Sequence, residues 1–109
     1  MDIAEVSKKV YRFQKERVAT FGVQLTPEIV FFHLCEEIGE IARQLVNKNL
    51  PMRDYDESDL KEEVAQAMLD LLVLSEVFNI NLSEALDRKM DDKTESRIIA
   101  KAFIGQRYL

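Results

Sequence analysis

The stretch from Val64 to Phe78 most constrains the fold, because apolar residues occur on nearly every side of the helix that it predicts. Its apolar members are Val64, Ala65, Ala67, Met68, Leu69, Leu71, Leu72, Val73, Leu74, Val77 and Phe78. A helix that is apolar all round requires burial on all sides. Three further short helices in a chain of 109 residues do not surround it completely. We therefore expect a second subunit to cover the remaining face, with a central helix of a monomeric bundle as the alternative.

Apolar periodicity and capping signals predict four main helices. Their expected ranges are about 3–21, 27–47, 59–78 and a shorter segment after residue 81. The predicted N-caps are Thr26 before Pro27, Asp56 or Ser58, and Asn81 with Glu84 three residues on. With no repeat or linker in the chain, residues 1–109 are expected to form a single all-α domain. Its expected architecture is an antiparallel bundle of four main helices, completed by dimerisation.

Composition narrows the classes of function. The single cysteine, Cys35, excludes an internal disulfide framework and a cysteine-rich zinc module. No apolar run approaches about 18 residues, and the N-terminus lacks a secretory pattern, so we expect a cytoplasmic protein that does not cross a membrane. The net charge of −5 argues against a nucleic-acid polymer as partner. An acidic chain that handles an anionic ligand needs a cation between the two.

Clustered carboxylates on two predicted helices suggest that cation. Glu37 and Glu40 share a face of the second helix although like charges at this spacing repel. Gly39 between them costs about 1 kcal/mol relative to alanine. Glu63 and Asp70 share a face of the third helix, with Gln66 between them. Opposed antiparallel faces of this kind would bring these four carboxylates together.

Oxygen ligands of this kind suit Mg²⁺, with Mn²⁺ as a substitute. The alternative is that the glutamates simply face water. A di-iron centre would need Glu-x-x-His twice, whereas His33 precedes Glu36 by three residues. His33 lies one turn before Glu37, where it is expected to contact substrate, to support a ligand or to be a hydrogen-bonded core residue.

Basic residues further along the chain form a candidate site for an anionic ligand. Lys89, Lys93 and Arg97 are spaced at i, i+4 and i+8, so they form one stripe on a helix. The stripe is expected to bind the anionic part of a substrate. A solvated face with local partners such as Asp92 is the alternative.

Three sequence blocks in order resemble the MazG-like all-α nucleoside triphosphate pyrophosphohydrolases. They are Thr26-Pro27-Glu28 leading into His33-Leu34-Cys35-Glu36-Glu37-Ile38-Gly39-Glu40, then Lys61-Glu62-Glu63-Val64-Ala65, then Asn79-Ile80-Asn81-Leu82-Ser83-Glu84-Ala85-Leu86. The resemblance covers roughly residues 26–97. It implies hydrolysis of nucleoside triphosphates to monophosphate and pyrophosphate by a homodimer or a dimer of dimers.

The resemblance also implies roles for single residues. Glu37, Glu40 and Glu63 would ligate Mg²⁺, and Glu36 would orient or deprotonate the attacking water. The family has aspartate where this chain has Gln66, and often asparagine where it has Lys93. Either Asp70 replaces the missing ligand and Gln66 contacts substrate, or the protein is a catalytically silent module that binds nucleotide or dimerises.

Overall fold

The computed structural model describes residues 1–91 and 101–102, and these form helices joined by turns and loops, with no strand. The helices are α1 (Ile3–Ala19), α2 (Pro27–Lys48), α3 (Glu57–Val77) and α4 (Leu82–Lys89). The all-α class is therefore confirmed, and the bounds of α1, α2 and α3 and the start of α4 lie within about two residues of their predictions. None of the described helices is both long and apolar enough to cross a membrane.

Side-chain caps explain where the helices begin. The hydroxyl of Thr26 accepts a hydrogen bond from the backbone N–H of Ile29, 3.3 Å away, and thereby starts α2. Of the two predicted caps of α3, Asp56 and Ser58, the structure uses Asp56. The side-chain oxygen of Asn81 accepts from the N–H of Glu84 at 3.1 Å and starts α4. These local signals confirm three N-termini read from the sequence.

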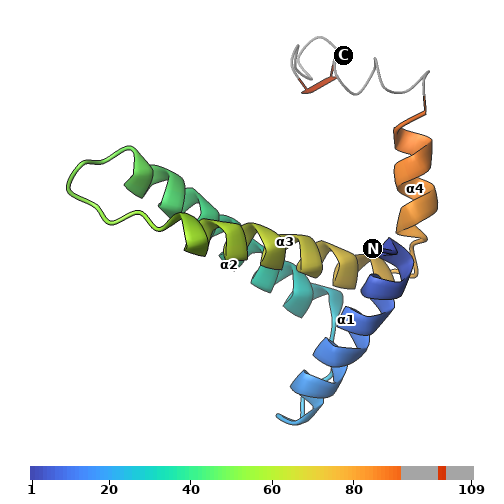
Figure 1. The fold of residues 1–109 in the computed structure, drawn as a ribbon. Helices are drawn as coiled ribbons and strands as arrows, with labels where there is room; N and C mark the ends of the chain where they lie inside the picture. Colours follow the sequence, from blue (N-terminus) through green and yellow to red (C-terminus); the bar gives the residue numbers. More distant parts are fainter. Residues whose placement is uncertain (92–100, 103–109) are drawn as a thin grey trace.

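The helices form an open arrangement in which α2 and α3 are an antiparallel hairpin (Figure 1). Helix α1 packs across the C-terminal part of α3, and α4 continues beyond the end of α3 and contacts α1. The part of the hairpin near its loop, residues 49–56, extends away from both α1 and α4 (Figure 1). A single chain therefore leaves much of the α2–α3 surface uncovered.

The core lies where α1, α2 and α3 meet, and it is small. Among the described residues the buried apolar side chains are Val30, Leu34, Leu72 and Val73. Met68 and Leu71, on the same helix as the last two, are 53% and 44% exposed. The chain thus buries one side of the apolar helix α3 and leaves another side in solvent. Whether a second subunit covers it stays a prediction.

Candidate metal centre between α2 and α3

Three glutamates predicted as metal ligands lie on the two helices of the hairpin, Glu37 and Glu40 on α2 and Glu63 on α3. Burial raises the pKa of the Glu63 carboxyl on α3. The negative charges of Glu40, Asp59 and Glu37, in that order, raise this pKa further, whereas the cation of Arg43 lowers it. Like charges shift a pKa only when they are near. Glu63 of α3 is therefore within electrostatic reach of Glu37 and Glu40 of α2.

One oxygen of Glu63 has no partner within the described part of the chain. Its Oε2 atom is buried and accepts no hydrogen bond. A buried polar atom without a partner is unusual in native structures. Glu40, in contrast, forms an ion pair with Arg43 one turn on. The orphan oxygen, the half-buried carboxylates and their mutual repulsion fit a bound cation, which would supply the missing contact.

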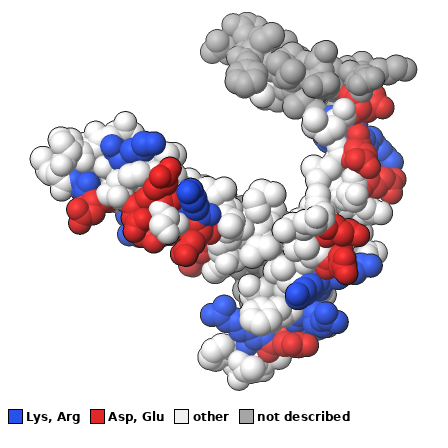
Figure 2. Space-filling view, in the orientation of Figure 1, with Lys and Arg blue, Asp and Glu red and all other residues white. Residues whose placement is uncertain are grey.

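The carboxylates nevertheless stand apart in this conformation. Within the described residues, no three His, Cys, Asp or Glu side chains converge as they would around a bound ion. Figure 2 shows acidic side chains gathered over the hairpin on the side of its loop, with basic side chains beside them.

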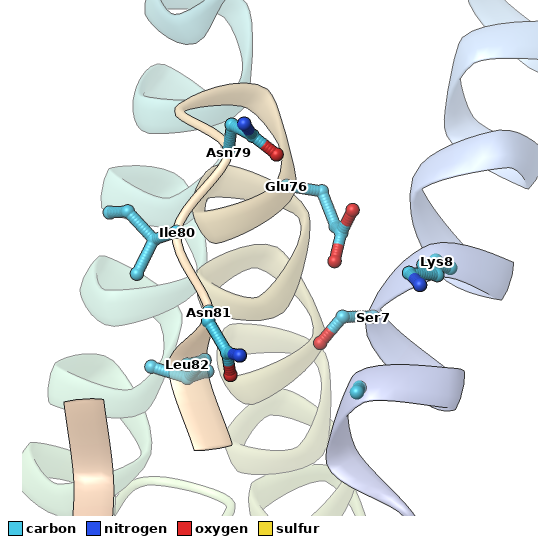
Figure 3. A pocket seen from close by; sticks show the side chains of 8 residues that line it. Ser7, Lys8, Glu76, Asn79, Ile80, Asn81 and Leu82 are labelled. Atoms are coloured by element: carbon cyan, nitrogen blue, oxygen red, sulfur yellow. The ribbon is translucent and has the colours of Figure 1, made fainter. Parts of the chain in front are cut away.

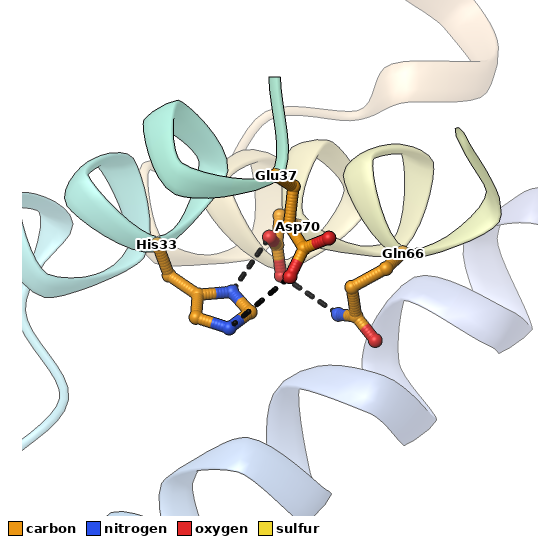
Figure 4. Close-up of polar contacts among 4 residues, drawn as sticks. All are labelled: His33, Glu37, Gln66 and Asp70. Atoms are coloured by element: carbon orange, nitrogen blue, oxygen red, sulfur yellow. Dashed lines mark hydrogen bonds and ion pairs between the residues drawn. The ribbon is translucent and has the colours of Figure 1, made fainter. Parts of the chain in front are cut away.

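Asp70 is buried and makes hydrogen bonds through both carboxylate oxygens (Figure 4). Its Oδ2 lies 2.8 Å from Nδ1 of His33, and its Oδ1 accepts from the amide Nε2 of Gln66 at 3.1 Å. The predicted role of Asp70 as a direct metal ligand would use the lone pairs that these two bonds leave free. The amide of Gln66 acts as a donor, which an aspartate at this position would not do at neutral pH.

His33 connects this hydrogen-bonded group to the glutamates. Its Nε2 atom lies 3.7 Å from Oε1 of Glu37, one turn further along α2 (Figure 4). The side chain of His33 is 46% exposed, whereas that of Asp70 is 4% exposed. His33 is therefore not a core histidine, and one edge of its ring remains open to ligands.

The remaining predicted residues are more scattered. Glu36 lies exposed on α2 next to Glu37. Lys89 ends α4, which leaves α3 at the end away from Glu63 (Figure 1), so this chain does not bring Lys89 to the carboxylates. Lys93 and Arg97 lie outside the described residues. The basic stripe consequently stays a prediction.

Sequence reasoning missed several polar residues that extend the seam between α2 and α3. Gln44 is buried, and its Oε1 accepts from the backbone N–H of Asp56 at 3.4 Å. Asn47 has a buried side-chain oxygen without a partner among the described residues. Along α2 the polar residues are His33, Glu37, Glu40, Gln44 and Asn47, and successive members are four, three, four and three positions apart. That spacing marks one helix face and would have identified them.

A cavity of about 220 Å³ opens beside His33 and Asp70. Gln14 and Arg17 of α1 line it, together with Phe21 from the connection to α2. The N-terminal helix thus contributes polar and aromatic groups next to the candidate centre.

A second cavity of about 230 Å³ lies near the C-terminal end of α3, where Glu76 faces Ser7 and Lys8 of α1 (Figure 3).

Comparisons of the chain with family models, with curated proteins and with solved structures give no match.

Proposed function

We propose that this protein is a Mg²⁺-dependent nucleotide pyrophosphohydrolase that converts nucleoside triphosphates to monophosphate and pyrophosphate. The proposal rests on the resemblance of three sequence blocks to MazG-like enzymes. The observation that carries it is the Glu63 carboxylate, with its raised pKa and unpartnered Oε2, facing Glu37 and Glu40. Such a site binds a hard divalent cation through oxygen atoms.

In this proposal Glu37, Glu40 and Glu63 hold Mg²⁺, for which Mn²⁺ substitutes. A bound cation of this kind stabilises charge on phosphate oxygens and lowers the pKa of its water. Glu36, exposed beside Glu37, orients or deprotonates the attacking water. Substrate contacts are assigned to His33 and Gln66, which line the seam, and to the basic stripe Lys89, Lys93 and Arg97.

The exposed apolar surface supports a homodimer or a dimer of dimers as the active assembly. Phe31 and Phe32 of α2 line one groove with Leu74 and Phe78 of α3. Leu74 and Phe78 also line a second groove that continues to Leu86 of α4. The apolar surface is thus continuous across three helices. Monomers rarely expose apolar patches larger than a few hundred Å².

Pyrophosphate release from a panel of nucleoside triphosphates, canonical and damaged, tests the proposed activity. We expect release with Mg²⁺ or Mn²⁺, none in EDTA, and none from the Glu63→Ala variant. The Glu62→Gln variant is a matched control, since Glu62 is the exposed neighbour of Glu63. The absence of release across the panel would overturn the proposed hydrolysis.

The silent module is the second candidate, favoured by Gln66 at the position of a family carboxylate. Its amide nitrogen donates to Asp70, and an amide does not supply the negative charge of the family carboxylate. Binding of Mg²⁺ and nucleotide with no pyrophosphate release would support that candidate.

A further inference from the structure

His33 is the single histidine of the chain, and it is held on both sides by carboxylates. Nδ1 lies 2.8 Å from the buried Asp70, and Nε2 lies 3.7 Å from Glu37. Gln66 donates to the other oxygen of Asp70, so this carboxylate is fixed from two directions (Figure 4). The buried carboxylate of Asp70 therefore orients a ring that would otherwise rotate freely in solvent.

The contact with Asp70 sets the tautomer of the ring. A carboxylate that accepts a hydrogen bond from Nδ1–H leaves the lone pair of a neutral imidazole on Nε2. A carboxylate behind one ring nitrogen with a metal on the other is the usual arrangement of metal-binding histidines. The side chain of His33 is 46% exposed, and the Nε2 edge that faces Glu37 carries no hydrogen bond as short as the 2.8 Å contact at Nδ1.

The distance between Nε2 and Glu37 also fits a shared ion. Zn²⁺ lies about 2.0–2.2 Å from nitrogen and oxygen ligands, so two ligands of one ion are about 3.0–3.6 Å apart. The observed 3.7 Å is longer than a hydrogen bond and needs only a small side-chain rotation to reach that range. His33 and Glu37, at i and i+4, reach the same point above α2.

We propose that His33 Nε2 and Glu37 form a second cation site for a transition-metal dication such as Zn²⁺ or Fe²⁺, with Asp70 positioning the imidazole from behind. An imidazole nitrogen favours these ions over Mg²⁺. Water or phosphate oxygens complete the coordination. The site extends the metal centre of the proposed function, and it rests on that function only in sharing Glu37.

Imidazole ¹⁵N spectra of the full chain test this site, because every histidine signal comes from His33. On titration with Zn²⁺ we expect the Nε2 resonance to move to that of a metal-bound nitrogen while Nδ1 stays protonated. Mg²⁺ alone should leave both resonances in place. Calorimetry should give a Zn²⁺ affinity about 10–100-fold lower for Asp70→Asn. Glu37→Gln should lower it as well, and Glu62→Gln should not.

Asp70 is buried, so the Asp70→Asn chain is first checked for helix content. His33→Asn keeps the measurement decisive if that variant unfolds, since His33 is on the surface and its loss should abolish high-affinity Zn²⁺ binding. Unmoved ¹⁵N resonances at saturating Zn²⁺ would overturn the site. So would a shift that persists with equal affinity in Glu37→Gln, because that outcome means adventitious binding to an exposed ring.

The two proposals fail separately. Unmoved resonances together with Mg²⁺ binding that depends on Glu63 would remove the second site and leave the proposed function. A moved Nε2 resonance without pyrophosphate release would support the second site and overturn the proposed hydrolysis.

Discussion

Nδ1 of His33 lies 2.8 Å from Oδ2 of Asp70, which ties an exposed ring on α2 to a buried carboxylate on α3 across 37 positions of sequence. This contact fixes the register of the hairpin next to the candidate ligands Glu37 and Glu63. If the register slipped by one helical turn, about 5.4 Å, Glu63 would no longer face the two glutamates of α2. The hydrogen bond therefore links the stability of the fold to the geometry of the site.

Replacing Asp70 with alanine should destabilise the fold. Both His33 and Gln66 lose a charged acceptor, and a hydrogen bond to a charged group contributes about 1.5–3 kcal/mol. Urea unfolding at neutral pH should show a loss in this range, and His33→Ala alone should cost less because that ring is half exposed. In the double variant the two losses should not add, since they share one bond. Additive losses would show that the contact contributes nothing.

Replacing Glu63 with glutamine should stabilise the metal-free protein. Because the pKa of Glu63 is raised in the fold, ionising this carboxyl is costlier in the folded chain than in the unfolded one. The penalty is present at pH 7 and disappears as pH falls through the raised pKa toward the ordinary value of 4.5. Thermal unfolding in EDTA should therefore favour Glu63→Gln at pH 7, and the advantage should shrink near pH 4.5.

The exposed variant Glu62→Gln is the control for this pH series and should show no such trend. A large loss of stability in Glu63→Gln at pH 7 would mean that Glu63 is a structural partner and not a strained ligand.

The sequence was sufficient for the helices because their ends depend on local contacts. Thr26 and Asn81 accept hydrogen bonds from residues three positions on, and such caps are visible as short motifs. The influence of the Glu37 and Glu40 charges on Glu63 likewise agrees with helical spacing, which puts these residues on the facing sides of two antiparallel helices.

Other features depend on tertiary packing and could not be predicted from local sequence patterns. Helix α3 is apolar on all sides, so periodicity cannot separate the buried Leu72 from the exposed Met68 and Leu71. The pairing of Asp70 with His33 requires the register of the hairpin, which no local signal sets. The course of α4, and with it the position of Lys89, depends on how the chain leaves α3.

The turn after α3 should tolerate glycine but not a branched residue. Asn79 has a φ of 54°, and the N–H of Ile80 donates to the carbonyl of Ser75 at 2.8 Å, which closes the helix end. A left-handed conformation costs about 1–2 kcal/mol for most residues. Unfolding measurements should give that loss for Asn79→Val and little change for Asn79→Gly. Equal stability of the two variants would contradict the assigned turn.

Assembly should depend on the uncovered side of α3. Met68 is 53% exposed although it lies in the middle of an apolar helix. We expect light scattering to report at least a dimer, and Met68→Glu to weaken association at least tenfold while the helices persist. Met52→Glu is the control, because Met52 lies in the loop and is already 88% exposed. A folded wild-type monomer at micromolar concentration would refute the dimer.

The Gln66→Asp variant distinguishes two explanations of Gln66. Either the chain has lost a metal-ligating carboxylate at this position, or Gln66 has a different role beside Asp70. In the structure the Gln66 amide donates to Asp70, so an aspartate there would set two carboxylates one turn apart without a donor between them. If the chain has simply lost a family ligand, the new carboxylate should raise Mg²⁺ affinity and any pyrophosphate release.

If Gln66 instead holds Asp70 for His33, the same change should free Asp70 and loosen the imidazole. Metal affinity should then fall or stay unchanged, and stability should decrease as in Asp70→Ala. We expect this second outcome, because both oxygens of Asp70 already have partners. Calorimetry with Mg²⁺ and urea unfolding of the same variant decide the matter, and higher Mg²⁺ affinity with unchanged stability would contradict our assignment.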